Sequence, residues 1–516
     1  MSHRFALLLA ALGALSVAPA RAQEEPPPPP SGTSGLGGQN QPGQGAGQSF
    51  SDPSQLFTGT SGAFFGLGFT NISGEGLYAS TIVNTEFNLG PVGLGLALPL
   101  NLLVWNNDNC CGNDPDPDGN HPHSRDYKAY GGVLRKRDWN QWQDYARLIR
   151  YVRYGHKRDP LYVLAGQMWG ASIGHGTLLN RYANNISIDH PKFGLALDLN
   201  STFVGVETIT DSVTGPTILG GRVYVRPFGD TLVLRGLAIG ATLITDRTAP
   251  RSLAYDVRGG PGPDGSLPLK QDPATGSVIV DNYDAMYAAG VDVEYEVLRN
   301  SLIQLIPYVD GNRLLGAGNG LHVGVLTNLF LPVPIIAVDL QTRFEYRFMK
   351  PGYIPEYFDQ TYDLGRIQYA TNQSNNTTTY RPKFAAAQDA SALGGKPRKG
   401  YYGELSFGFG GLVQVGGLYQ DYEGDPNGAS LGLFATLPKF ELIKLSGYYL
   451  RKNMAGLSDA FHIDERSLLA ASAAYKMFGP LYLRIDYKRQ WQLRPGDSQI
   501  KAIDSFSAGL ATFVPL

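Results

Sequence analysis

Long stretches of the chain place apolar residues at every second position. In one of them, residues 336–348, the alternate positions between the apolar side chains carry Asp339, Arg343, Glu345 and Arg347. A repeat of two residues predicts a β-strand, because successive side chains of a strand point to opposite sides. The clearest such row consists of Val92, Leu94, Leu96, Leu98, Leu100, Leu102 and Val104. These strands run for about 12–16 residues, beyond the usual 5–6, and can cross a bilayer at a tilt.

The connections between these stretches alternate between short and long. The short ones lie at 90–91, 155–160, 200–201, 229–230, 299–300, 332–334, 410–411, 438–439 and 479–480. The long, polar ones cover 106–138, 171–189, 247–281 and 351–398. Tight turns at one end and long loops at the other are typical of barrels with periplasmic turns and extracellular loops. Nine turns with both termini in the periplasm predict about 20 strands, or 18 if residues 64–69 form no strand.

Residues 61–516 therefore resemble the bacterial outer-membrane β-barrel class, with a porin-like pattern. The resemblance implies an all-β fold: a single transmembrane, antiparallel, up-and-down barrel. The composition agrees, because the chain has 64 Gly and 29 Tyr, only 17% charged residues and a mean hydropathy of −0.16. All five tryptophans, which interfacial aromatic girdles place at headgroup level, fall at the long-loop ends of strands: Trp105, Trp139, Trp142, Trp169 and Trp491.

The first 22 residues have the features of a secretory signal. Arg4 precedes an apolar run from residue 5 to 17, and Ala20-Arg21-Ala22 has the small-x-small pattern of a cleavage site. Residues 23–60 contain five consecutive prolines and a Gly/Ser/Gln-rich tract, a composition that favours an extended, flexible periplasmic segment. We therefore expect export to the outer membrane, with lipid and the barrel assembly machinery as partners. A net charge of −2 gives no indication of a nucleic-acid partner.

Charged residues on the polar phase of the strands are expected to face the lumen, since charge against lipid is costly. Such residues would line a water-filled passage or brace the interior through cross-strand ion pairs, and both interpretations stay open. Their signs nearly balance, which predicts weak ion selectivity. The residues are Glu86, Asp198, Glu207, Arg222, Arg226, Asp292, Glu294, Glu296, Asp339, Arg343, Glu345, Arg347, Glu404, Lys444, Lys476, Arg484, Asp486 and Lys488.

One loop has the composition of a cation site. Asp114, Asp116 and Asp118 alternate before a glycine, and carboxylates so spaced can converge on Ca²⁺. The acidic residue that would complete an EF-hand loop is absent, so a plain surface loop is the alternative. His121 and His123 together with the adjacent Cys110 and Cys111 suit zinc by residue type. Adjacent cysteines suit it poorly by geometry, and a vicinal disulfide is equally consistent. Apart from this possible Ca²⁺, no cofactor is expected.

The sequence favours a channel for passive diffusion of small solutes. A barrel of this width cannot fill its interior with strand side chains alone. The alternative is a plugged barrel that serves as a surface receptor, adhesin or envelope scaffold. We do not expect an enzyme, because scattered histidines such as His175 and His322 are more often structural than catalytic. The 351–398 loop is the longest candidate to fold inward and narrow the pore.

Overall fold

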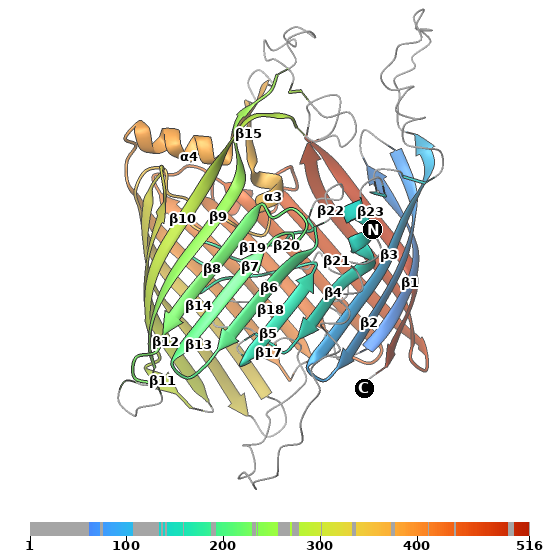
Figure 1. The fold of residues 1–516 in the computed structure, drawn as a ribbon. Helices are drawn as coiled ribbons and strands as arrows, with labels where there is room; N and C mark the ends of the chain where they lie inside the picture. The colour runs from blue at the N-terminus through green and yellow to red at the C-terminus, as the bar shows by residue number, and fades with distance from the viewer. Residues whose placement is uncertain are drawn as a thin grey trace, which may run out of the picture. The chain divides into compact units, whose positions relative to one another are not determined.

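A single closed β-sheet dominates the computed structural model (Figure 1). The predicted signal peptide 1–22 and segment 23–60 lie outside the described residues. The structure describes residues 61–72, 76–106, 134–135, 138–139, 142–157, 159–186, 192–229, 234, 236–255, 269–270, 278–300, 302–332, 337–372, 377–410, 412–437, 440–493 and 500–514.

Twenty antiparallel strands form the barrel, as the sequence predicted. Each strand pairs with its neighbour in the chain, and the two-residue strand β11 (Leu298–Arg299) continues β10 past an irregularity. The strands are β1 (Ser61–Ile72), β2 (Gly76–Leu89), β3 (Val92–Asn106), β4 (Ile149–Tyr154), β5 (Leu161–Gly166), β6 (Gly194–Asn200), β7 (Val204–Thr210), β8 (Ile218–Val225), β9 (Leu237–Leu253), β10 (Val280–Tyr295), β12 (Ile303–Leu314), β13 (Asn319–Pro332), β14 (Ala337–Met349), β17 (Arg398–Phe409), β18 (Val413–Glu423), β19 (Ala429–Leu437), β20 (Ile443–Met454), β21 (Ser467–Phe478), β22 (Leu481–Leu493) and β23 (Ile500–Val514).

The burial pattern shows which phase of each strand faces outward. Val291 is 60% exposed, whereas its neighbour Asp292 is 2% exposed. On β14, Phe344 and Phe348 are exposed, whereas Arg347, on the opposite phase of the strand, is fully buried. The outer surface is therefore apolar and the charges lie inside, which is the reverse of a soluble sheet sandwich and the arrangement that lipid requires.

The nine predicted short turns all lie between consecutive strands at the same end of the barrel. The opposite end carries the longer connections, with the 3-10 helices η3 (Trp142–Leu148) and η4 (Leu457–Asp459). The β14–β17 connection adds α3 (Tyr362–Gly365), the hairpin β15 (Ile367–Asn372) and β16 (Thr377–Pro382), and α4 (Lys383–Ala392). Within the described part of the chain, no helix is long and apolar enough to span a membrane.

The barrel closes where β1 pairs with β23 along their full lengths, from Ser61 opposite Val514 to Ile72 opposite Ile503. Two glycines make this seam tight. A Cβ on Gly509 would lie 2.3 Å from the Gly66 Cα, and a Cβ on Gly68 would lie 2.2 Å from the Phe506 carbonyl oxygen. The strands cannot hold this spacing if either position carries a side chain.

We expect Gly509→Val to destabilise the barrel by about 1–3 kcal/mol, because overpacking forces the seam strands apart. The matched control is Gly447→Val on β20, where an added Cβ would have no atom within 4 Å. Urea unfolding in lipid vesicles, followed by tryptophan fluorescence, measures both variants. Equal midpoints for the two variants would contradict the importance of the seam.

Candidate functional site

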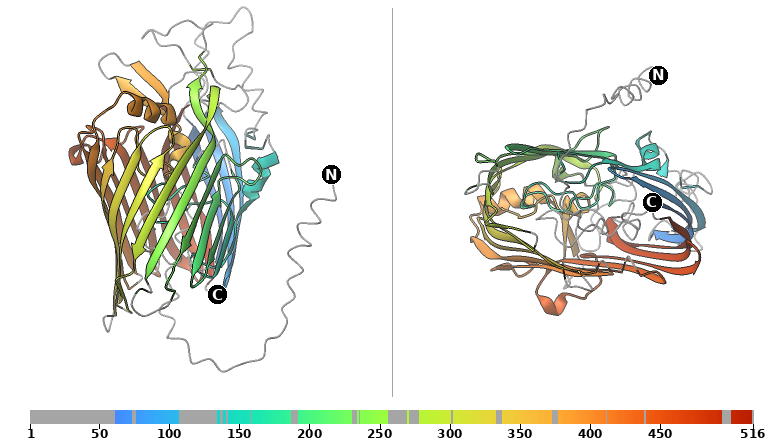
Figure 2. Two further views of the ribbon diagram at one scale, coloured as in Figure 1. Left: turned by 60° about the vertical axis from the view of Figure 1, so that its left-hand side comes forward. Right: turned by 90° about the horizontal axis from the view of Figure 1, so that it is seen from below.

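Two connections from the loop end fold back into the barrel (Figure 2). We call residues 168–186, between β5 and β6, the inner loop, and residues 350–366, after β14, the strap. The two segments pair through their backbones: the amide of Asn180 donates to the carbonyl of Phe358 at 3.0 Å, and the amide of Phe358 donates to the carbonyl of Leu178 at 3.0 Å. The amide of Glu356 also donates to the Thr177 carbonyl at 2.8 Å. Together the loops form one hydrogen-bonded unit.

This unit packs against one side of the barrel wall. Tyr182 from the inner loop and Phe358 and Tyr362 from the strap are buried in the largest apolar cluster. The wall supplies the inward-facing residues Ala196, Ile209, Ile218, Ile244, Ala249, Met286, Ala288, Leu314, Met349 and Tyr422. Among the described residues, this cluster draws on β6–β10, β12, β14 and β18, and on no residue of β19–β23 or β1–β4. The largest apolar contact of the inward loops thus lies on one side of the interior, and a smaller cluster joins Ile186 and Leu364 to β19–β21.

Glu345 on β14 is the centre of a buried charge network beneath the strap. It accepts hydrogen bonds from Arg343 Nε at 2.8 Å and from Arg347 Nε at 2.6 Å. Tyr308 and His322 complete its shell, with the hydroxyl at 2.5 Å and the imidazole Nδ1 at 3.0 Å. One carboxylate thus compensates two arginines, and every member of the network is almost fully removed from solvent.

The same network holds the inward loops. The Tyr353 hydroxyl lies 2.8 Å from His322 Nε2, and Arg347 Nη2 donates to Glu356 at 3.0 Å. On the inner loop, Arg181 Nη2 donates to Glu404 on β17 at 2.6 Å. The wall charges therefore act as anchoring points for the strap and the inner loop.

His175 anchors the inner loop to a third place on the wall. Its Nε2 lies 2.7 Å from Glu294 on β10, and its ring stacks on Tyr308 at 4.0 Å between centroids. Burial opposes a charge on this imidazole, but the carboxylates of Asp310 and Glu294 outweigh burial and raise the pKa of His175 to about 9. The ring is consequently protonated at neutral pH and holds the loop as a cation.

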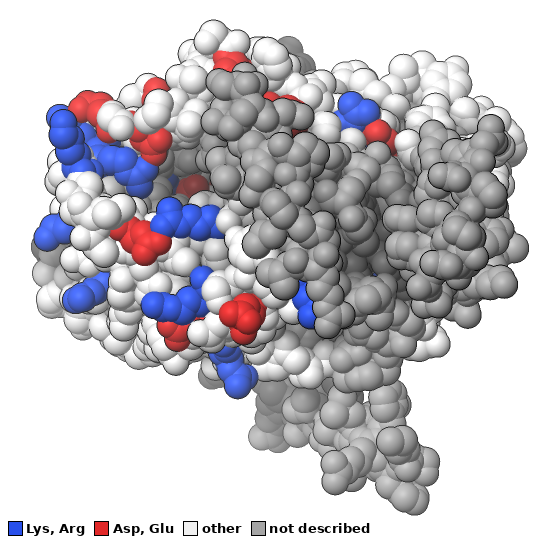
Figure 3. All heavy atoms as spheres, turned by 90° about the horizontal axis from the view of Figure 1, so that it is seen from above, with Lys and Arg blue, Asp and Glu red and all other residues white. Residues whose placement is uncertain are grey.

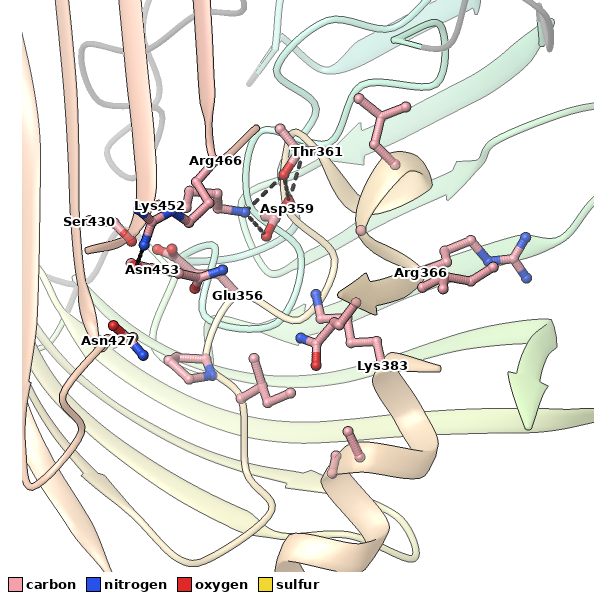
Figure 4. Close-up of a pocket in the computed structure, with 18 of the residues that line it drawn as sticks. Glu356, Asp359, Thr361, Arg366, Lys383, Asn427, Ser430, Lys452, Asn453 and Arg466 are labelled. Carbon is pink, nitrogen blue, oxygen red and sulfur yellow. Dashed lines mark hydrogen bonds and ion pairs between the residues drawn. The ribbon is translucent and has the colours of Figure 1, made fainter. Parts of the chain in front are cut away.

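The strap also contacts β20, in the part of the wall that contributes no residue to the largest apolar cluster. Lys452 on β20 pairs with Asp359 (Figure 4). The Tyr448 hydroxyl, on the same strand, donates to Gln360 at 2.6 Å. Toward β9, the Tyr362 hydroxyl donates to Asp246 at 2.7 Å. The strap thus crosses the lumen between β9 and β20 and contacts both strands through residues 359–362.

A cavity of about 1500 Å³ lies between the strap, α4 and the β18–β22 wall. We call it the vestibule. Acidic and basic side chains are mixed in its lining, and Figure 3 shows both signs close together on the described part of the loop end. Apolar and amide side chains fill the spaces between them. Its charged lining residues are Lys192, Glu356, Asp359, Asp363, Arg366, Lys383, Lys396, Arg398, Asp425, Lys452, Asp464, Glu465 and Arg466.

The pKa values of two titratable groups of the vestibule are both lowered, for different physical reasons. Burial opposes ionisation of Asp359, but Lys452 and Lys383 outweigh burial and hold its pKa at about 2. Burial lowers the pKa of Lys383 to about 8, because the attraction of Asp359 offsets only part of the desolvation and the charge of Lys452 repels the ammonium. The Lys383 ammonium donates to the Tyr357 carbonyl at 2.6 Å. The Asp359–Lys452 tie is therefore ionic at neutral pH.

The charges predicted to line the lumen fall into two groups. Those under the loops are buried in ion pairs, including Asp292 with Arg222, whose Nη2 lies 2.6 Å from the carboxylate. The buried set is Asp198, Glu207, Arg222, Asp292, Arg343, Glu345, Arg347, Glu404, Arg484 and Asp486. The partly exposed set is Glu86, Arg226, Glu294, Glu296, Asp339, Lys444, Lys476 and Lys488. Their role as a pore lining stays a prediction.

The sequence reasoning missed the inner loop, which it treated as an extracellular excursion at 171–189. A signal was present, because Ile173, Leu178, Leu179 and Tyr182 are more apolar than a solvated loop needs. The proposed Ca²⁺ ligands Asp114, Asp116 and Asp118, and the two cysteines, lie outside the described residues. Within the described residues, no group of three or more His, Cys, Asp or Glu side chains could hold a metal ion.

No protein-family model and no curated protein matches this chain. Solved structures with similar backbones are outer-membrane proteins. They include the siderophore receptor PirA of Acinetobacter baumannii (TM-score 0.32, 9% identity, 88% of this chain and 80% of that one). They also include OccK2 of Pseudomonas aeruginosa in complex with glucuronate (0.32, 11%, 88% and 95%) and a BenF-like porin of Pseudomonas fluorescens (0.30, 11%, 89% and 97%). The similarity is one of barrel construction and identifies no family for this chain.

Glu345→Gln should destabilise the folded barrel by about 3–5 kcal/mol, because it leaves two buried arginines without their shared countercharge. Glu423→Gln is the control: Glu423 pairs with Lys399 at 3.3 Å on the exposed rim, where a pair contributes about 0–1 kcal/mol. Urea titration of both proteins in vesicles gives the free energies of unfolding. A change below 1 kcal/mol for Glu345→Gln would show that the network is not needed for stability.

Proposed function

We propose that the protein is an outer-membrane channel for passive diffusion of small polar solutes, with both chain ends in the periplasm. Solutes enter the vestibule and pass the edge of the strap into the periplasmic half of the lumen. Selection depends on the width of the passage and on the field of the charges around it, as in other pores. The mixed signs in the vestibule favour weak selection between anions and cations.

The observation that carries this proposal is the width of the barrel together with the uneven filling of its interior. A closed barrel of 16–18 strands already leaves an aqueous channel, and this barrel has 20. The largest apolar cluster joins the inward loops to β6–β10, β12, β14 and β18, whereas a smaller cluster joins Ile186 and Leu364 to β19–β21. One ladder row there runs through Ser446, Ser472, Asp486, Ser507 and Gly68. Space for solute is therefore expected beside β20–β23 and β1.

The second candidate function is a plugged barrel that serves as a receptor or scaffold. The anchoring of the strap at both walls favours it, because a tied segment across the lumen can block passage as well as narrow it. The two functions differ in one property, the flow of ions through the folded barrel.

Single-channel recording in planar bilayers distinguishes the two. The wild-type protein should give stable current steps that grow with salt concentration and show weak selectivity. Asp359→Asn should raise the conductance or its fluctuations, because the strap loses its ionic tie to Lys452. The matched control is Asp389→Asn, which breaks an exposed pair with Arg381 in the same connection. A correctly folded wild type without current would support the plugged barrel instead.

The strap should also respond to pH in a defined range. The pKa of Asp359 is about 2 in the fold, against 3.8 for the free side chain, so its charge stabilises the strap fully above pH 4. This stabilisation is lost as the pH falls through 2. We expect the conductance contributed by this tie to be constant from pH 7 to 4, with Asp359→Asn showing at pH 7 the fluctuations that the wild type shows near pH 2. A strap transition centred between pH 5 and 7 in the wild type, and absent from Asp359→Asn, would contradict this assignment.

A further inference from the structure

Three polar side chains lie in one row across β12, β13 and β14, at the loop end of the barrel. The ladder pairs Arg313 on β12 with Asn319 on β13, and the amide of Lys350, directly after β14, donates to the Asn319 carbonyl at 2.8 Å. All three residues are exposed. We call them the outer triad. Their strands are neighbours in the wall (Figure 1), so each cation is one strand spacing, about 5 Å, from Asn319 along the row.

The residues beside the outer triad show that it faces away from the lumen. Asn312 and Leu314, on either side of Arg313 in the chain, are both buried inside the barrel. Met349, which precedes Lys350, is buried there as well. Because successive side chains of a strand point to opposite sides, the triad has the outward phase, which it shares with the lipid-facing apolar residues.

The height of the outer triad follows from the apolar residues beneath Asn319. The outward positions of β13 from Leu331 to Leu321 are occupied by leucine, valine and threonine alone. This stretch is about 34 Å long, and at a tilt of about 40° it rises about 26 Å along the membrane normal. Outer-membrane barrels present an apolar band of about 25 Å to lipid. Asn319, the next outward position, therefore lies at the level of the headgroups.

The two cations of the outer triad lack a countercharge. Elsewhere on the outer phase, Arg489 lies 2.6 Å from the carboxylate of Asp504, which compensates it. Among the described residues, no carboxylate forms an ion pair with Arg313 or Lys350. Because charge at the edge of the lipid is costly without compensation, an anionic group from the surroundings is the expected partner of this pair.

We infer that the outer triad binds a phosphate group of an outer-leaflet lipid. Guanidinium and ammonium groups are common donors to phosphate, and the side-chain amide of Asn319 between them can donate a further hydrogen bond. A phosphate placed over Asn319 lies within reach of both long side chains. The inference rests on the proposed orientation, with the chain ends in the periplasm, but it requires no open lumen.

The surroundings of the outer triad favour a lipid over a soluble anion. The next outward row toward the membrane centre consists of Gly311, Leu321 and Phe348. The two apolar side chains are 42% and 46% exposed, and acyl chains joined to a phosphate on the triad would lie along them. Only the short turn 315–318 joins β12 to β13 above this row. One lipid molecule can therefore satisfy both the cations and the apolar row.

The first test is native mass spectrometry of the full-length protein titrated with lipid A, whose headgroup carries phosphates. The wild type should bind lipid A about tenfold more tightly than the same lipid after removal of its phosphates. Arg313→Gln and Lys350→Gln should each weaken lipid A binding about fivefold, and the double variant about 25-fold. Arg299→Gln removes the same charge from an exposed side chain at the short-turn end of the wall, so it is the matched control and should bind as the wild type does.

The second test identifies the occupant in outer-membrane vesicles. In a background with Cys110→Ser and Cys111→Ser, a benzophenone attached to Asn319→Cys should cross-link to lipid A, whereas one attached to Arg299→Cys should not. A membrane-impermeant maleimide should label Ala317→Cys, in the turn above the triad, on intact cells. This labelling tests the orientation separately from the binding.

Several results would overturn the inference. Equal binding of lipid A with and without its phosphates would do so, as would equal binding by the double variant and the wild type. Cross-linking of Asn319→Cys to a protein chain would identify a different partner, and displacement of lipid A by excess inorganic phosphate would indicate a site for soluble anions. An unlabelled Ala317→Cys would overturn the orientation together with the leaflet, whereas loss of conductance alone would leave the lipid site intact.

Discussion

The cost of polar groups in lipid is the constraint on which this structure depends. Backbone amides and carbonyls at membrane depth must pair within the protein, which a sheet achieves only by closing on itself. Closure requires β1 and β23 to meet at full length, and glycines at the seam permit it. The same constraint fixes the phase of every strand. Arg451 on β20 is one exception, because it lies on the outer phase and pairs with Asp459 and Asp464 of the β20–β21 loop. Arg489 on β22 and Asp504 on β23 are another, because they lie on the outer phase and pair with each other.

Charged side chains on the inner phase of the strands need countercharges within a confined space. Glu345 between Arg343 and Arg347 shows how this is done, with neighbouring inward positions of one strand carrying opposite signs. Donors and acceptors of the wall that do not bond to one another form hydrogen bonds with the strap and the inner loop. The interior charges and the inward loops are thus parts of one structure, so stability of the wall and position of the loops are coupled.

The sequence alone was enough to predict the features that depend on local backbone geometry. Strand phase, the nine short turns and the count of about twenty strands follow from the two-residue repeat and from turn residues. The inner loop could not be predicted in this way, because its burial depends on Phe358, some 180 positions from its partner Asn180. For the same reason Arg347 could be assigned to the interior, but its pairing with Glu356 on the strap could not.

In the proposed channel, the position of the inward loops determines which charged residues would act on a passing solute. Charges beneath the loops, such as Arg222 with Asp292, are buried and already neutralised by each other, so their field on a passing solute is small. Partly exposed charges at the edge of the strap act on solute directly, and Lys452 with Asp359 is the pair placed there. The interior as a whole is balanced in sign, yet selection would depend on these few residues, because a field acts most strongly where the passage is narrowest and least hydrated.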